Sequence, residues 1–217
     1  MPAQNPLRDS NRRRFGLIET LRWEPSGGAI RASRHLDRMQ ASAAHFGKAF
    51  DRSEAERLLE SVTAETTLRV RLLLDDDDRL GLTSHAFQPL QDDPFWTVKI
   101  AQAKLSSTDD LLPHKTTVRQ VYEKARAEFA ANDADEVLME NENGFLCEGT
   151  ITSLFVAKAE TLVTPRLSHG LLRGVLRQQY IDEGKAVEGD LTRADLESHE
   201  FFIGNSLREL IRGRLAK

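Results

Sequence analysis

The sequence has almost no cysteine and no long hydrophobic run. Cys147 is the only cysteine among 217 residues, which excludes an internal disulfide and a metal site made of cysteines alone. No apolar stretch approaches the roughly 18–20 residues of a membrane-spanning helix, and the polar start at Met1–Asn5 lacks the apolar core of a signal peptide. We therefore expect a cytoplasmic protein in a reducing compartment, with no membrane partner.

The chain also lacks a strong charge of one sign. Its formal net charge is −4, and its one basic cluster, Arg12–Arg14, is typical of a solvated terminal segment, so we expect no nucleic-acid partner. Hydrophobic residues make up 40% and charged residues 29% of the chain, which is the balance of a soluble globular protein. The length allows one compact unit or two lobes that share a cleft.

The N-terminal half predicts strands with two helices. Period two places Ile18, Thr20 and Arg22 on one face of the first strand, and Ser33 is the expected N-cap of the first helix. The acidic run Asp75–Asp78 reads as a solvated hairpin turn, with a metal site as the less favoured alternative. The expected elements are a strand at 15–23, helices at 33–46 and 53–64, and antiparallel strands at 66–74, 79–87 and 96–103.

A polar linker then separates two different patterns. We expect a small lobe over residues 1–105, a linker over 106–114 and a larger lobe over 115–217, in an α+β fold. The expected elements of the larger lobe are helices at 116–131 and from Gly170 to about 181, and short strands at 136–139, 153–156, 161–164 and 200–203.

Lys115 is the first candidate for chemistry. It directly precedes the helix expected at 116–131, where the helix dipole and free amides disfavour an ammonium ion and lower its pKa. A lysine that loses its proton easily suits Schiff-base formation. The alternative is an exposed lysine, one of eight in the chain.

Glu148 is the second candidate, because it stands in an otherwise uncharged stretch that leads into an apolar strand. A buried carboxylate needs a cationic or proton-donating partner, and a pyridinium nitrogen would serve. The alternative is a rim glutamate paired with a surface arginine. Gly170 before a helix and Asn205-Ser206 after a strand offer backbone amides to a phosphate, and Arg38 could add a fixed positive charge.

Six motifs occur in an order and spacing that resemble one family. They are Ile18–Arg22, His35–Met39, His114–Thr117, Glu148–Phe155, Gly170–Gly174 and Asn205–Arg208. The sequence resembles the fold-type IV pyridoxal-phosphate enzymes, which include branched-chain and D-amino-acid aminotransferases and 4-amino-4-deoxychorismate lyase. The resemblance implies a small α/β lobe and a larger lobe with a mixed, barrel-like sheet and flanking helices. It also implies a homodimer.

The resemblance assigns expected roles to particular residues. Lys115 would hold pyridoxal 5′-phosphate as a Schiff base, and Glu148 would pair with the pyridine nitrogen. Thr20, on the same strand face as Arg22, is our own candidate for guiding a proton to the leaving group, and the alternative is a strand threonine in a polar layer. The phosphate would be bound by Arg38, the amides of Leu171 and Leu172, and Asn205, and Ser206 would contact the cofactor where the pocket borders the substrate side. Apart from the resemblance, we expect Arg22, Arg119 and Thr152 to bind the substrate, because guanidinium groups suit carboxylates.

The motifs look most like those of the lyases, in particular His-Lys-Thr-Thr followed by Arg119, and the Asn-Ser-Leu-Arg ending. The expected reaction is release of pyruvate from 4-amino-4-deoxychorismate to give 4-aminobenzoate. An aminotransferase for branched-chain or D-amino acids is the nearest alternative. Family members commonly have a longer N-terminal hairpin, so a non-catalytic homologue that binds the cofactor is a third.

Overall fold

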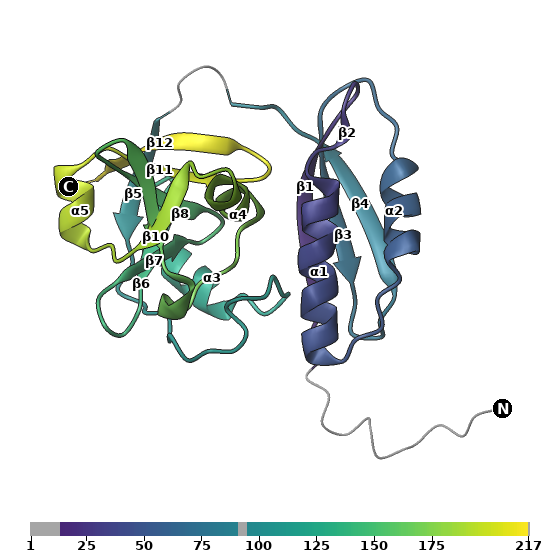
Figure 1. Cartoon of the computed structure of the whole chain (residues 1–217), viewed down its shortest axis with the longest axis horizontal. Helices are drawn as coiled ribbons and strands as arrows, with labels where there is room; N and C mark the ends of the chain where they lie inside the picture. The colour runs from purple at the N-terminus through teal and green to yellow at the C-terminus, as the bar shows by residue number, and fades with distance from the viewer. Residues whose placement is uncertain (1–13, 91–94, 217) are drawn as a thin grey trace, which may run out of the picture.

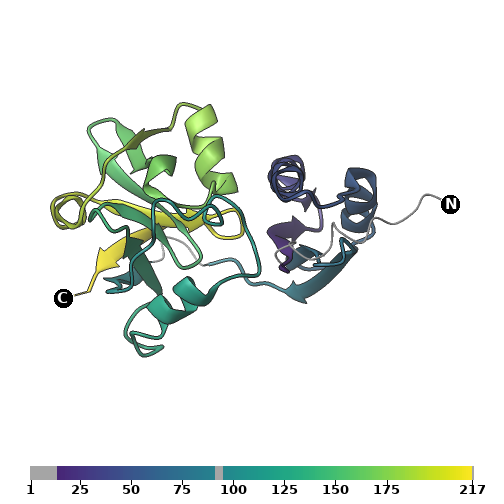
Figure 2. The same ribbon diagram turned by 90° about the horizontal axis from the view of Figure 1, so that it is seen from below.

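The computed structural model describes residues 14–90 and 95–216, which form two lobes (Figures 1 and 2). The expectations about the Met1–Asn5 start and about Arg12 and Arg13 concern residues outside these ranges. In the part of the chain that is described, no helix is both long and apolar enough to cross a membrane.

The small lobe is a four-stranded antiparallel sheet with two helices on one face. The strand order is β2-β1-β3-β4, and the helices α1 and α2 pack side by side (Figure 2). The elements are β1 (Leu17–Glu24), β2 (Gly28–Ala29), α1 (Ala32–Phe46), α2 (Arg52–Glu60), β3 (Leu68–Leu74) and β4 (Leu80–Ala86).

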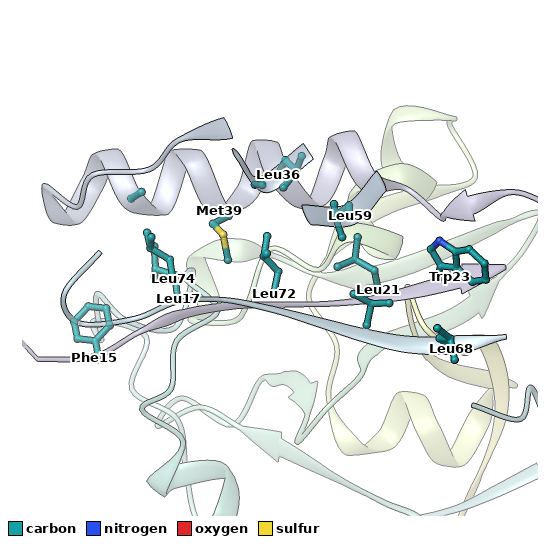
Figure 3. Close-up of a cluster of buried hydrophobic side chains, with 13 residues drawn as sticks. Phe15, Leu17, Leu21, Trp23, Leu36, Met39, Leu59, Leu68, Leu72 and Leu74 are labelled. Carbon is teal, nitrogen blue, oxygen red and sulfur yellow. The ribbon is translucent and has the colours of Figure 1, made fainter. Parts of the chain in front are cut away.

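Alternation along β1 decides which side chains meet the helices. Leu17, Leu21 and Trp23 lie in the core between the sheet and the helices, together with Leu36 and Met39 of α1 (Figure 3). Each such side chain stabilises the fold by about 1.5–3 kcal/mol through burial. Ile18, Thr20 and Arg22 alternate with these residues along β1 and therefore face away from the helices, as the period-two pattern predicts.

The acidic turn Asp75–Asp78 joins β3 and β4 as a hairpin, as predicted. Lys48 fixes it from the segment after α1, because its buried Nζ donates to the Asp75 carbonyl at 2.8 Å and to Asp78 Oδ1 at 3.2 Å. The backbone amide of Ala49 donates to the other Asp78 oxygen at 3.0 Å. The turn is thus held to the helical layer by a charged contact.

The larger lobe is a six-stranded mixed barrel with two strands added to it. Around the barrel the order is β8-β11-β12-β5-β6-β7, and β7 closes onto β8 at Glu148 opposite Ser153. Its elements are β5 (Phe95–Ile100), α3 (Gln120–Arg126), β6 (Glu136–Glu140), β7 (Leu146–Gly149), β8 (Ser153–Lys158), β9 (Thr161–Pro165), a 3-10 turn at Leu167–His169, α4 (Val175–Asp182), β10 (Ala186–Gly189), α5 (Arg193–Ser198), β11 (Phe201–Asn205) and β12 (Glu209–Leu215). The α+β fold of two lobes is confirmed.

The strand expected at 96–103 does not join β3 and β4. β5 instead pairs in parallel with β12 and β6 in the larger sheet. Alternating polarity reports which face of a strand is buried but not the direction of its neighbour, so the antiparallel expectation was wrong. The division of the chain at residues 106–114 stays a prediction.

Three helix starts also differ from expectation. Arg31, in a left-handed conformation with φ 58°, occupies the N-cap of α1, and Ser33 lies inside the helix. The helix expected from residue 116 begins only at Gln120, because Thr116 pairs with Leu17 next to β1. Gly170, with φ 82°, ends the 3-10 turn, and α4 starts after Gly174.

Substitution of Gly213 on β12 would test the packing of the barrel. A Cβ at this position would lie 2.0 Å from Cε2 of the buried Phe201 ring. We expect Gly213→Ala to lower the free energy of unfolding by about 1–3 kcal/mol, because the ring must leave its rotamer. Thermal denaturation measures the loss. Gly81→Ala on β4, with no heavy atom within 4 Å, is the matched control, and an equal loss there would contradict the packing argument.

Candidate active site

A cavity of about 480 Å³ lies between the lobes and collects most of the predicted residues. Both lobes contribute to its lining, which includes Thr20, His35 and Arg38 from the small lobe, Lys115 from the connecting segment, and Glu148 and Ser206 from the larger lobe. Side chains far apart in the sequence therefore face one shared cavity. A cavity of this size with a few convergent polar groups is the usual form of a small-molecule site.

Lys115 lines this cavity, but the physical reason for its lowered pKa differs from the one that the sequence suggested. The segment runs beside β1, with the amide of Ile18 donating to the Lys115 carbonyl at 2.9 Å, so the lysine does not stand at a helix start. Burial, followed by the charges of Arg38 and Arg119, lowers the pKa of Lys115 to about 8 against the opposing charges of Glu19 and Glu148. A large fraction of the amine is therefore neutral near pH 8.

Glu148 is a buried carboxylate with few compensating contacts. The Tyr122 hydroxyl donates to its Oε1 at 2.7 Å and the Leu172 amide donates to the same oxygen at 3.1 Å. Burial raises the pKa of Glu148 to about 7, although these hydrogen bonds and the charges of Lys115 and Arg119 act in the opposite direction. A cation beside this carboxylate would restore its ionised form, and a pyridinium nitrogen fits that requirement.

The residues predicted to bind phosphate have different surroundings. Arg38 lines the cavity, where its Nε donates to Glu19 Oε1 at 2.8 Å and its Nη1 to the Arg173 carbonyl at 3.0 Å. Leu171 is buried in the core of the larger lobe. The Leu172 amide already donates to Glu148, so phosphate contacts from these two amides stay predictions.

Asn205 and Ser206 have different partners within the chain, and the cofactor contacts expected of them stay predictions. The Asn205 amide group donates to the Ile151 carbonyl at 3.1 Å, and its Oδ1 accepts from the amides of Leu207 and Arg208 at 3.0 and 2.9 Å. Asn205 therefore shapes the loop between β11 and β12. Ser206 lines the cavity beside His35, with 2.8 Å between its Oγ and His35 Nε2.

Of the expected substrate residues, Arg22 lies outside the cavity lining. It pairs with Glu24 at 2.9 Å and with Glu209 at 3.2 Å, so its charge is already matched. Thr20 lines the cavity, as do Arg119 and Thr152. Arg119 donates to the Thr150 carbonyl at 2.5 Å and lies 4.8 Å from the centre of the Tyr122 ring, and the Thr152 hydroxyl donates to Glu136 at 2.8 Å.

Two arginines of the cavity were missed in the sequence. Arg69 comes from β3, and Arg208 follows β11 and lies 5.5 Å from the ring centres of Phe87 and Trp96. Burial, followed by the charge of Arg69, lowers the pKa of Arg208. The alternation of β3 could have indicated Arg69, because Arg69 and Arg71 pair with Arg22 and Thr20 on the sheet face away from the core.

Comparison with known proteins identifies the family of this chain. The family model described as amino-transferase class IV matches residues 16–215. This chain belongs to the class IV aminotransferase family. Its members typically depend on pyridoxal phosphate, and the fold-type IV resemblance seen in the six motifs is confirmed.

Relatives within the family carry two kinds of name. A Schizosaccharomyces pombe protein provisionally named aminodeoxychorismate lyase is 29% identical over 189 residues, which cover 83% of this chain and 82% of the relative. A Thermotoga maritima protein named a probable branched-chain-amino-acid aminotransferase is 30% identical over 181 residues, which cover 79% of this chain and 64% of the relative. The solved structure of a Mesorhizobium loti protein, provisionally named an amino-acid aminotransferase, is 44% identical with a TM-score of 0.89, and the match covers 93% of this chain and all of that one.

The raised pKa of Glu148 predicts a stability cost above neutral pH. A carboxyl whose pKa rises from 4.5 to about 7 on folding stabilises the protein below pH 4.5, and this contribution is lost as the pH rises to about 7. At pH 8 without cofactor, we expect Glu148→Gln to raise the free energy of unfolding by about 3 kcal/mol, seen as a higher midpoint in thermal denaturation.

Glu136→Gln is the matched control for this prediction. Glu136 is equally buried but accepts hydrogen bonds from Thr150, Ile151 and Thr152, so its replacement is expected to lower the midpoint. A Glu148→Gln protein that is less stable than wild type at pH 8 would contradict the argument, whereas a difference that vanishes near pH 4.5 supports it.

Proposed function

We propose that this chain is a pyridoxal-phosphate lyase that converts 4-amino-4-deoxychorismate into 4-aminobenzoate and pyruvate. Lys115 and Glu148 support the cofactor part of the proposal. A lysine with a pKa of about 8 can react with an aldehyde, and a buried carboxylate that lacks a cation suits a protonated pyridine ring. When bound, pyridoxal phosphate supplies an electron sink for the carbon that bears the amine.

The cluster of guanidinium groups supports the substrate part. Within residues 14–90 and 95–216, no ion pair joins Arg69, Arg119 or Arg208 to a carboxylate, and all three line the cavity. Neighbouring like charges repel, so a bound anion is favoured there. The proposed substrate carries two carboxylates, and guanidinium groups bind carboxylates through paired hydrogen bonds. This unmatched positive charge is the observation that carries the proposal.

Lys115 and Thr20 would handle the protons of the reaction. With the cofactor bound to the substrate amine, the free Lys115 amine would be the base that takes the proton from the amine-bearing ring carbon. Thr20 faces the cavity from β1 and is the candidate for guiding a proton to the departing enolpyruvate. Loss of that group leaves an aromatic ring, which drives the reaction forward.

An aminotransferase is the second candidate, and the names of the relatives favour it as much as the lyase. The Mesorhizobium loti relative at 44% identity bears an aminotransferase name. Lys115 would perform the same proton transfer, and the arginines would suit a dicarboxylic amino acid. For both candidate functions we expect a homodimer whose active site lies near the subunit interface.

The decisive experiment supplies the purified protein with pyridoxal phosphate and then with aminodeoxychorismate. We expect pyruvate and 4-aminobenzoate in equal amounts without an added 2-oxo acid. We also expect a visible absorption band of the loaded protein that Lys115→Ala removes together with activity. Turnover only when an amino donor and a 2-oxo acid are both present would show the aminotransferase instead. A bound cofactor without either turnover would indicate the non-catalytic homologue.

Arg208 tests the substrate assignment. Because a charge-assisted hydrogen bond contributes about 1.5–3 kcal/mol, we expect Arg208→Gln or Arg69→Gln to raise KM for aminodeoxychorismate roughly 10- to 100-fold with a smaller effect on kcat. Arg22→Gln is the matched control, since Arg22 is paired outside the cavity lining. Equal effects of all three substitutions would show that the arginines act through net charge alone.

A further inference from the structure

A line of hydrogen bonds crosses from the small lobe to the larger lobe beside Arg38. His35 Nδ1 lies 2.6 Å from Glu19 Oε2, and His35 Nε2 lies 2.8 Å from Ser206 Oγ. All three residues are at most 5% exposed. Glu19 comes from β1, His35 from α1, and Ser206 follows β11, so the line joins three separate elements.

The carboxylate at one end fixes where the protons lie. Burial alone would raise the pKa of Glu19, but the charges of Arg38 and His35 and their hydrogen bonds lower it to about 2. An ionised carboxylate only accepts hydrogen bonds, so His35 Nδ1 must carry a proton. This assignment holds for the neutral and for the cationic ring.

The state of Nε2 then decides what Ser206 offers to the cavity. Burial lowers the pKa of His35, Glu19 raises it, and the charges of Arg38 and Lys115 lower it further, with a net lowering that favours the neutral ring. A neutral ring with its proton on Nδ1 has a bare Nε2, which accepts the only proton of the Ser206 hydroxyl. Ser206 then turns lone pairs toward the cavity, which is unfavourable next to a dianion.

We propose that binding of a phosphate monoester dianion beside Arg38 and Ser206 is coupled to the uptake of one proton by His35. The proton comes from solvent and occupies Nε2, which then donates to Ser206 Oγ, and the Ser206 proton turns to a phosphate oxygen. No bond between heavy atoms changes, and Ser206 becomes a phosphate donor. His35 and Glu19 act as positioning residues for it.

The charged groups around His35 are consistent with this coupling. Glu19 on β1 favours the cation, whereas Arg38 on α1 and Lys115 on the connecting segment disfavour it, and the neutral Ser206 faces it from the larger lobe. A phosphate carrying about two negative charges at pH 8 offsets the two opposing cations. The inference rests on the proposed cofactor but applies to the lyase and the aminotransferase alike.

The test follows the His35 ring nitrogens by 15N NMR in histidine-labelled protein at pH 8. Pyridoxine 5′-phosphate is the probe, because it lacks the aldehyde that reacts with Lys115. We expect one protonated and one bare nitrogen in the free protein and two protonated nitrogens in the complex. A ring-nitrogen signal is needed because Lys115 and Glu148 also titrate near this pH and affect any affinity profile.

Variants separate this mechanism from a merely structural role. Ser206→Ala should weaken binding of the probe roughly 10-fold or more, the loss of one charge-assisted hydrogen bond, and Ser206→Thr should restore it. Ser42→Ala is the matched control, because Ser42 is the other buried serine bonded to a histidine, 2.8 Å from His114 Nδ1, and should change neither affinity nor the His35 signals.

The remaining outcomes separate a failure of the proton coupling from a failure of the cofactor assignment. If His35 stays neutral in the saturated complex, the coupling is wrong while the cofactor assignment stands. If neither pyridoxine 5′-phosphate nor pyridoxal 5′-phosphate binds, the cofactor assignment fails and the coupling fails with it.

Discussion

The buried carboxylate of Glu19 is the constraint on which the arrangement of the lobes depends. A carboxylate at 1% exposure is tolerated only when cations and donors surround it, and here Arg38 and His35 supply them. The same two side chains reach the larger lobe at the Arg173 carbonyl and at Ser206. Satisfying one charge in the small lobe therefore also ties that lobe to two segments of the larger one.

Two other charged residues of the cavity lack such a balance. Lys115 and Glu148 both have pKa values shifted toward the neutral form, and burial is the largest cause for each. Groups perturbed in this way tend to cluster where a protein does chemistry, because a bound partner can complete what the fold leaves incomplete. The two buried carboxylates thus differ. Glu19 is balanced by a cation and donors of the protein itself, whereas Glu148 leaves room for a ligand to supply the cation.

The sequence predicted the lobes and most strands because alternation and helical spacing are local properties. It also singled out Lys115, Glu148 and Arg38 as candidates, and all three line the cavity. It failed where tertiary contacts override local preference. Thr116 pairs with Leu17 instead of starting a helix, so burial and neighbouring arginines shift the pKa of Lys115 where a helix dipole was expected.

The roles of the arginines and polar loop residues were equally beyond local patterns. Arg22 and Arg69 lie on the same face of adjacent strands. Arg22 is neutralised because Glu24 and Glu209 lie beside it, whereas Arg69 faces the cavity. Asn205 and Ser206 are neighbours in the sequence, yet one shapes a loop and the other contacts a buried histidine.

The lone cysteine gives this architecture a chemical reporter. Cys147 is fully buried on β7 directly before Glu148, and burial, followed by the charge of Glu148, raises the pKa of its thiol to about 12. Such a thiol is inert toward alkylating reagents while the strand is in place. Its rate of modification therefore measures how often β7 opens, and a ligand that steadies Glu148 should slow that reaction without touching the sulfur.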